Sequence, residues 1–306
     1  KLIAKGERLD AVLVNPPRRG LESRLRERIA ELAPRVLIYV SCAPRSLARD
    51  AWDLARLGFA PQNFTPFDLI PFSDAVEVLC EFMPAAVTPP RVVYEDERFL
   101  AVEKAPHEMT TPQHGHARSL FERVRLLPGA EKAVPIHRLD SGTSGLCLFA
   151  RREDHVHLLK QALSQGEKRY QALVKGRTHD KGAIRRPLRE GPRVLEARTR
   201  YTRRALVGGH SLLEVRPEQG RTHQIRKHFS GLGHPLLGDT RYGDPASNAY
   251  FWHRHGLDRT FLHLESVVLT LGDGPVELRC ELAPDLLAVL ESLKGGSDRS
   301  NPGFGD

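Results

Sequence analysis

The sequence reads HRLDSGTSG from His137 to Gly145 and continues directly into the apolar run LCLFA from Leu146 to Ala150. An apolar run of this length, bounded by turn residues, predicts a buried strand. The residues before it predict a loop in which Asp140 follows Arg138 by two positions. Glycines allow such a loop to approach a ligand closely, because they carry no side chain. Asp, Ser, Gly and Thr are also ordinary turn residues, so only the whole motif is informative.

The motif resembles HRLD-x-x-TSG, the signature of the RluA family of pseudouridine synthases. That resemblance implies that Asp140 is the catalytic residue of an enzyme that isomerises uridine in RNA to pseudouridine. Two further stretches resemble the same family. KRYQALVKG, residues 168–176, is similar to K-x-Y-x-A-x-V-x-G, which implies that Tyr170 stacks on the target base. GRTHQIR, from Gly220, is similar to the family motif whose Arg pairs with the catalytic Asp, a role the resemblance gives to Arg221.

The resemblance covers most of residues 91–293 and includes YEDERFLAVEKAP near the start and PLLGDTRYG near the end. It implies an α+β catalytic domain with a mixed or antiparallel central sheet. The reaction breaks the N1–C1′ bond and rejoins the base through C5, without redox change or group transfer, so we expect no cofactor. The residues leave open whether Asp140 acts as nucleophile or as base.

Local patterns predict several elements of this domain. Residues 155–163 have the spacing of an amphipathic helix, and residues 284–293 predict a last helix. Strand-like stretches at 194–206 and 211–216 are joined through Gly208-Gly209, a turn signal. Residues 262–271 predict another strand, and residues 294–306, rich in Gly, Ser and Asp, predict a disordered tail.

Charge points to a polyanionic partner. The net charge is +8, and residues 175–228 hold 15 basic against 5 acidic residues. A solvated face is the usual meaning of a basic segment, but this excess favours RNA, because Lys and Arg neutralise phosphates and release counterions. We therefore expect RNA, ribosomal or transfer, as the partner. The residues expected to bind it are His137, Arg138, Arg185, Arg186, Arg226 and Lys227.

The first 88 residues have a different character. They hold 12 basic and 11 acidic residues. Apolar runs at 11–14 and 36–40 alternate with helical stretches at 21–32 and 47–57, which predicts a parallel sheet with crossover helices. Residues 76–82 predict a last strand.

NPPRRG, YVSCAPRSLARD and DLIPFSDAVEVL in this segment resemble the C-terminal part of RNA uracil-5-methyltransferases, which have a Rossmann-like catalytic domain. The resemblance implies that Cys42 attacks C6 of uracil and that Glu77 removes the C5 proton. Ala43 replaces the usual Asn, Ser73-Asp74 replaces the usual His, and no glycine-rich donor loop is present. We therefore expect residues 1–84 to be an inactive methyltransferase tail, followed by a Pro-rich linker at 85–90.

Composition also narrows the classes of protein and of binding site that the sequence can represent. No apolar run approaches the roughly 20 residues of a membrane helix, and four distant cysteines without a CxxC pair signal neither zinc nor disulfides. We expect a cytoplasmic monomer without metal. Two alternatives remain: an S-adenosylmethionine-dependent RNA uracil-5-methyltransferase completed by upstream sequence, and a non-catalytic RNA-binding protein. The combination of Asp140, Tyr170 and Arg221 favours the isomerase, since binding alone does not need it.

Overall fold

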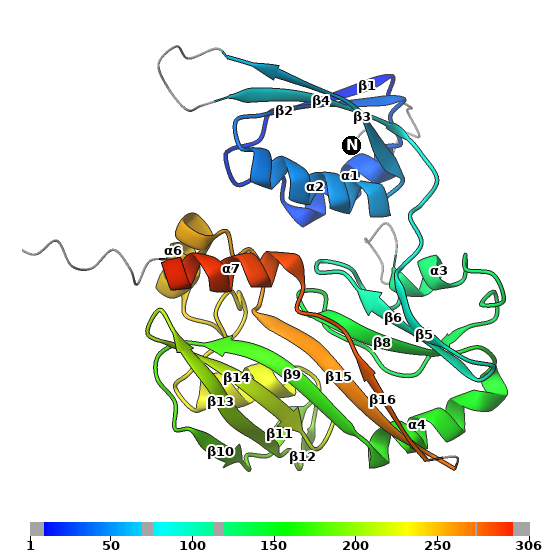
Figure 1. Cartoon of the computed structure of the whole chain (residues 1–306), viewed down its shortest axis with the longest axis vertical. Helices are drawn as coiled ribbons and strands as arrows, with labels where there is room; N and C mark the ends of the chain where they lie inside the picture. Colours follow the sequence, from blue (N-terminus) through cyan, green and yellow to red (C-terminus); the bar gives the residue numbers. More distant parts are fainter. Residues whose placement is uncertain (1–8, 69–75, 113–118, 273, 296–306) are drawn as a thin grey trace, which may run out of the picture. The chain divides into compact units, whose positions relative to one another are not determined.

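The structure is a computed structural model that describes residues 9–68, 76–112, 119–272 and 274–295 (Figure 1). The chain forms two compact units: unit 1 comprises residues 1–90 and 111–128, and unit 2 comprises residues 91–110 and 129–306. The predicted boundaries, a linker at 85–90 and a catalytic domain at 91–293, remain predictions. The tail predicted for 294–306 falls outside the described residues from position 296 onward.

Unit 2 is built on a ten-stranded sheet with the order β10-β13-β14-β9-β15-β8-β6-β5, in which β16 also pairs with β15 and β7 with β8. The first five strands of this sheet along the chain are β5 (Val92–Glu95), β6 (Phe99–Lys104), β7 (Val134–Pro135), β8 (Ser144–Ala150) and β9 (Glu167–Val174). The later ones are β10 (Lys181–Ile184), β13 (Thr199–Val207), β14 (His210–Pro217), β15 (Leu262–Leu271) and β16 (Gly274–Arg279). β8 and β15 run parallel, whereas the other pairs are antiparallel. The mixed sheet predicted from the sequence is confirmed.

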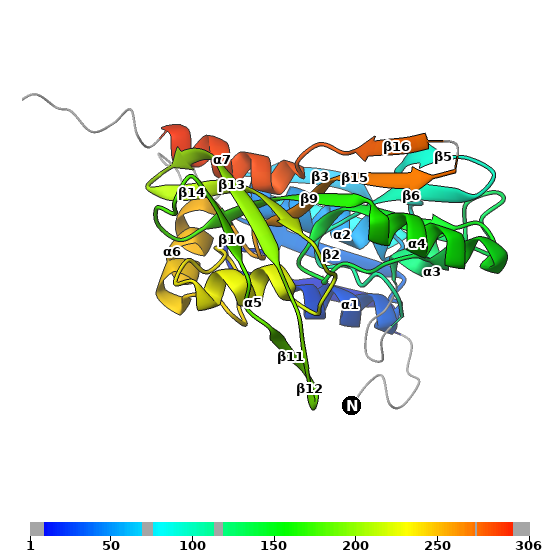
Figure 2. The same cartoon turned by 90° about the horizontal axis from the view of Figure 1, so that it is seen from below.

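Helices and a small hairpin complete unit 2. The helices are α4 (Val156–Gln165), α5 (Gln224–Gly231), α6 (Pro245–His255) and α7 (Pro284–Gly295). The hairpin consists of β11 (Leu188–Glu190) and β12 (Arg193–Leu195) and extends away from the large sheet (Figure 2). Among the described residues, no helix has both the length and the apolar character needed to cross a membrane.

The predicted strand after the HRLD motif is confirmed as β8, and all seven of its residues are buried. Gly145 to Ala150 pair with β6 on one side, and Ser144 and Gly145 pair with β15 on the other. Gly145 lies at this junction with φ +116°, and a Cβ there would lie 2.3 Å from the Leu264 carbonyl oxygen. Only glycine therefore fits where the Asp140 loop enters the sheet.

The turn predicted at Gly208-Gly209 joins β13 to β14, with φ values of 56° and 78°. Two positive φ values match the right-handed twist of a two-residue hairpin. The sequence did not predict β10, the β11–β12 hairpin, β16 or α6. Asp244 caps α6 by accepting a hydrogen bond from the Ser247 backbone at 2.8 Å, and Pro245 is its first residue. This start signal for a helix was present in the sequence.

Unit 1 has a four-stranded sheet with the order β1-β2-β4-β3. Its elements are β1 (Ala11–Val14), α1 (Ser23–Leu32), β2 (Val36–Ser41), α2 (Pro44–Arg56), β3 (Phe59–Phe67), β4 (Glu77–Pro84) and the short α3 (Leu120–Val124). Helices α1 and α2 lie on one face of the sheet (Figure 1). Arg26 and Asp50 are buried between them and joined at 2.6 Å, and Asp50 also accepts hydrogen bonds from the Tyr39 hydroxyl and the Leu21 backbone.

The parallel arrangement predicted for unit 1 is present only in the β1–β2 pair, because β4 is antiparallel to both β2 and β3. A Rossmann-like lobe is therefore not confirmed. β3 was missed because it contains Pro61 and Pro66. Proline is tolerated there since β3 is an edge strand, where a missing N–H need not break the sheet.

Candidate active site

Asp140 lies in a cavity of about 260 Å³ in unit 2. Three elements form its walls: the loop before β8, strand β9, and the segment from the end of β14 to the start of α5. The residues that line it are His137, Arg138, Leu139, Asp140, Thr143, Lys168, Tyr170, Pro217, Gln219, Gly220, Arg221, His223, Gln224, Ile225, Arg226 and Leu262. The HRLD, K-x-Y and GRTHQIR motifs therefore meet at one site, although the chain separates them widely.

Buried polar groups fix the backbone of the loop that carries Asp140. The Thr110 hydroxyl accepts a hydrogen bond from the Leu139 N–H and donates one to the Leu139 carbonyl, both at 3.0 Å. Lys104, fully buried on β6, donates from Nζ to the Ser141 carbonyl at 3.1 Å. Such bonds hold the residues on both sides of Asp140, because buried backbone groups left without partners are costly.

Arg259 supports the same loop from the other side. Its Nη1 donates to the Gly142 carbonyl at 3.0 Å. Its Nε and Nη2 bind the Asp285 carboxylate at 2.6 and 2.9 Å, a two-point contact that fixes the guanidinium plane. The Arg259 side chain is almost fully buried, so it has little freedom to leave the loop.

Arg226 binds the Asp140 carboxylate. Its Nη1 donates to Asp140 Oδ2 at 3.0 Å, while its Nε and Nη2 bind Asp239 at 2.7 and 2.8 Å. The guanidinium also lies over the Tyr242 ring, 5.1 Å from its centre. Burial by itself lowers the pKa of Arg226, but the bonds to Asp239 and Asp140 outweigh it and raise that pKa above its ordinary value. Arg226 is therefore a fixed cation beside Asp140.

Asp239 is buried and holds Arg226 in place. Burial alone would raise the pKa of Asp239, but the hydrogen bonds from Arg226 and from the Tyr242 backbone hold it below its ordinary value. The backbone N–H groups of Arg241 and Tyr242 both donate to Oδ1 at 3.0 Å. Asp239 is thus a carboxylate at neutral pH, and the two-point contact turns Nη1 of Arg226 toward Asp140.

The prediction that Arg221 pairs with Asp140 is wrong. Arg221 lines the cavity, but its Nε donates to the Glu196 carbonyl at 3.1 Å, beside the β11–β12 hairpin. Arg221 precedes α5, whereas Arg226 lies in the first turn of that helix. Both arginines belong to GRTHQIR, and the sequence alone could not tell which of them the helix turns toward Asp140.

Tyr170, on β9, lines the cavity with Asp140. Burial raises the pKa of Tyr170, and the nearby Asp140 carboxylate, followed by the Cys147 thiol, adds to the effect. The phenol is therefore neutral. It supplies an aromatic ring within the same cavity, and its stacking on a base remains a prediction.

The residues predicted to contact RNA fall into two groups. His137 and Arg138 line the cavity itself, together with Arg226. His137 Nε2 accepts a hydrogen bond from the Leu148 N–H at 3.3 Å, and burial lowers the pKa of His137 to about 3. His137 is therefore neutral and carries no charge toward a phosphate. Arg185 and Arg186 are exposed just before β11, and Lys227 lies half-buried on α5.

His223, Asp239 and Tyr242 were missed as site residues. His223 Nε2 lies 3.6 Å from Asp140 Oδ1, and its Nδ1 lies 3.0 Å from the Tyr242 hydroxyl. All three lie within GRTHQIR and PLLGDTRYG. The motifs therefore indicated which segments form the site, but not which of their side chains contact Asp140 or Arg226. Among the described residues, no group of three or more His, Cys, Asp or Glu side chains is arranged to hold a metal ion.

Cys42 and Glu77 belong to unit 1. Cys42 is partly exposed directly after β2, and Glu77 is the first residue of β4. Ser41 pairs with Val78 in the antiparallel ladder. Cys42 comes directly after Ser41 and Glu77 directly before Val78, so both lie at the same end of the sheet. The segment that replaces the usual His, Ser73-Asp74, lies outside the described residues.

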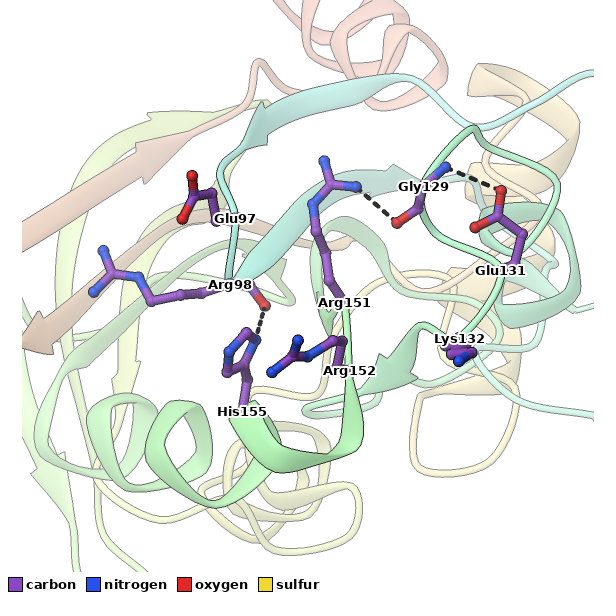
Figure 3. Close-up of a pocket in the computed structure, with 8 residues that line it drawn as sticks. All are labelled: Glu97, Arg98, Gly129, Glu131, Lys132, Arg151, Arg152 and His155. Atoms are coloured by element: carbon purple, nitrogen blue, oxygen red, sulfur yellow. Dashed lines mark hydrogen bonds between the residues drawn. The ribbon is translucent and has the colours of Figure 1, made fainter.

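A second cavity in unit 2, of about 470 Å³, lies at the opposite end of β8 (Figure 3). It is lined by Glu97, Arg98, Gly129, Glu131, Lys132, Arg151, Arg152 and His155. Its three guanidinium groups each face a carboxylate: Arg98 pairs with Asp96, Arg151 with Glu95, and Arg152 with Asp154. Their charge is balanced locally, and none of the three motifs reaches this cavity. The smaller cavity around Asp140 is therefore the candidate active site.

Comparisons with known proteins agree with this geometry. The family model for RNA pseudouridylate synthase matches residues 98–231. The ribosomal large subunit pseudouridine synthase C of Vibrio vulnificus is 30% identical over 218 residues, which are 66% of this chain and 69% of that protein. The tRNA pseudouridine synthase C of Haemophilus ducreyi is 32% identical over 199 residues, covering 56% of this chain and 82% of that protein.

A solved structure shows the same fold. Human RNA pseudouridylate synthase domain containing 4 superposes with a TM-score of 0.58 at 21% identity, covering 67% of this chain and 93% of that one. The fold, the three converging motifs and the relatives point the same way: this chain belongs to the RluA family of RNA pseudouridine synthases, isomerases that convert uridine in RNA to pseudouridine.

Proposed function

We propose that the chain isomerises specific uridines in structured ribosomal or transfer RNA, and that Asp140 is the carboxylate that acts on the nucleotide. The observation that carries this proposal is the Asp140 carboxylate in a cavity with Tyr170, bound by Arg226 at 3.0 Å. Arg226 fixes the orientation of the Asp140 carboxylate in the cavity, where it can act as nucleophile or as base.

The other residues of the cavity support the remaining steps. The target uridine must leave its stack to reach Asp140, which costs a few kcal/mol in a paired region. Tyr170 offers a ring on which the uracil can stack, a contact worth roughly 1–3 kcal/mol. Arg138 is exposed at the same cavity, where it can take the place of the extruded base or hold a phosphate.

The choice of RNA rests on the relatives. One is named for the large ribosomal subunit and another for tRNA. We propose RNA of these two classes as substrate, and the exposed arginines around β11 as part of the surface that receives it.

The test measures isomerisation directly. Transcripts of large-subunit ribosomal RNA and of transfer RNA, labelled with tritium at C5 of uridine, release tritium to water when pseudouridine forms. We expect the wild-type chain to release tritium, Asp140→Asn to release none, and the variant to bind the RNA with affinity within about threefold of wild type. Asp154→Asn, on the surface away from the cavity, is the control and should behave as wild type. Substantial turnover by Asp140→Asn would remove the carboxylate from the mechanism.

A further inference from the structure

His223 has an unusual backbone at the edge of the active site. Its φ and ψ are 55° and 31°, in the left-handed region, and it is the residue that precedes the first turn of α5. This conformation is uncommon for a residue with a side chain, although His, Asn and Asp adopt it more readily than others. Unfavourable backbone conformations persist where the surrounding structure requires them, and they cluster at functional sites.

The conformation directs the imidazole between two groups of the site. Nε2 lies 3.6 Å from Asp140 Oδ1, and Nδ1 lies 3.0 Å from the Tyr242 hydroxyl. Arg226 binds the other carboxylate oxygen, Oδ2. The two oxygens of Asp140 therefore face different partners, a permanent cation on one side and a titratable imidazole on the other. Catalytic hydrogen bonds are often long before substrate binds and shorten in the complex, so 3.6 Å is within reach of one.

Burial and three nearby cations lower the pKa of His223, so its imidazole is neutral at pH 7. Burial lowers its pKa, Asp140 raises it, and Arg226, Arg241 and Lys227 lower it further, so that the pKa lies below its ordinary value. A neutral imidazole carries one proton. When that proton is on Nδ1, it is donated to the Tyr242 oxygen, and the lone pair of Nε2 faces Asp140.

The chemistry creates a need for such a group. Once C5 is bonded to C1′, C5 must lose its hydrogen before the uracil ring is restored. Arg226 binds Oδ2 of Asp140, which leaves Oδ1 as the oxygen that can take this proton. The imidazole of His223 faces Oδ1, and it therefore lies where it can accept the proton from Asp140.

We propose that His223 is a positioning residue that accepts, at Nε2, the proton that Asp140 Oδ1 removes from C5. The inference rests on the proposed function. The C5–H bond breaks and its electron pair returns to the ring, while the proton passes to Oδ1 and then to Nε2. N1 of the product takes one proton from water, and His223 later returns one to water, so uridine and pseudouridine remain isomers and Asp140 is again a carboxylate.

The substitution His223→Gly tests the proposal, because glycine adopts this backbone conformation without strain. We expect kcat to fall about 100-fold or more, in the range expected for loss of a proton-transfer group, while KM for the RNA changes by less than about threefold. Added imidazole should restore turnover in proportion to its neutral form. RNA with deuterium at C5 should show a larger isotope effect on kcat in the variant, because removal of the C5 proton becomes slower.

Controls separate this inference from the proposed function. His157→Asn, exposed on α4, should keep wild-type turnover. If wild type releases no tritium, the proposed function fails. If wild type is active but His223→Gly keeps kcat within threefold, only the role of His223 is overturned. A folded variant that loses activity without imidazole rescue or a changed isotope effect also overturns it. Should His223→Gly not fold, His223→Asn, which tolerates the same backbone, is judged by the isotope effect alone.

Discussion

At the scale of single residues, the active site depends on which of two arginines meets Asp140. Arg226 is held at three points by two carboxylates, and its side chain is only 10% exposed. Arg221 binds a backbone carbonyl instead. A buried cation between two carboxylates contributes to both catalysis and stability, because removing it leaves buried charge without a partner.

Lysine substitution distinguishes the two arginines. Arg226→Lys should lower kcat by at least about tenfold, because a single ammonium cannot reproduce the planar contact with Asp239 and reach Asp140 at once. Arg221→Lys should stay within about threefold of wild type, since it keeps the positive charge and Arg221 binds a backbone carbonyl, not Asp140. Turnover at saturating RNA is the measurement. Equal losses in the two variants would contradict the assignment of Arg226.

At the scale of elements, β8 sets the position of the site, because the Asp140 loop leads directly into it and β15 packs against its start. Gly145 is the point of closest approach between these strands. A methyl group there would both clash with the Leu264 carbonyl and force a positive φ on a residue with a side chain. Overpacking and backbone strain therefore act at the same position.

Gly145→Ala should lower the free energy of unfolding by on the order of 3 kcal/mol. The matched control is Gly209→Ala, where φ is +78° but a Cβ would meet nothing within 4 Å. The control carries backbone strain alone and should cost roughly 1–2 kcal/mol. Urea unfolding of both variants measures the difference, and equal losses would show that contact with Leu264 is unimportant.

The arginines before and within β11 form the second element with an expected role. Arg185, Arg186 and Arg189 are exposed, and the hairpin is joined to the active site through the Thr222 N–H, which donates to Glu190 at 2.5 Å. An RNA strand that enters the cavity would pass close to this hairpin. Contacts to phosphate from these arginines would make binding depend on salt, because each releases counterions.

Replacement of these three arginines by Ala should reduce the slope of log affinity against log salt by about 2–3. The control removes the same charge elsewhere, from Lys132 and Arg152, which line the second cavity, and from Lys160, which is exposed on α4. Its slope should change by less than one. Titration of labelled RNA at several salt concentrations provides both values. An unchanged slope for the arginine variant would place the RNA on another surface.

At the scale of the whole molecule, His263 links β15 to β8 and to the residue that follows β16. It lies fully buried on β15, where Nδ1 is 2.9 Å from the Ser144 hydroxyl on β8 and Nε2 is 3.3 Å from Cys280, just after β16. Burial, with a smaller contribution from Arg259, lowers the pKa of His263 to about 4. Protonation of this side chain therefore opposes the folded state.

Stability should fall as pH drops from about 6.5, the usual pKa of His in an unfolded chain, toward 4. In that interval the unfolded chain binds a proton that folded His263 does not, so acid favours unfolding. The contribution of His263 is complete above pH 6.5 and decreases by a few kcal/mol in all. Urea unfolding from pH 4 to pH 8 should show a shallower pH dependence for His263→Asn than for wild type. Identical pH dependences would assign the acid sensitivity to other groups.

The sequence by itself determined the family and the strand that holds the site, and it predicted Asp140 and Tyr170, which line one cavity in the structure. These features are local: a buried strand is visible as an apolar run, and a motif is visible as a fixed spacing. The mixed sheet followed from the resemblance. Strand β3 was missed because its two prolines are unusual in a strand. Helix α6 was missed because its apolar residues do not follow a clear helical pattern, although the helix is capped.

Only the tertiary structure decided which groups meet at the carboxylate of Asp140. Arg226 is 86 positions away along the chain, and it lies in the first turn of α5, whereas Arg221 precedes that helix. His223 faces the second oxygen because its backbone has a conformation that no local pattern predicts. Spacing in sequence identifies segments, whereas the pairing of buried charges depends on how distant segments pack, and that packing exists only in the folded chain.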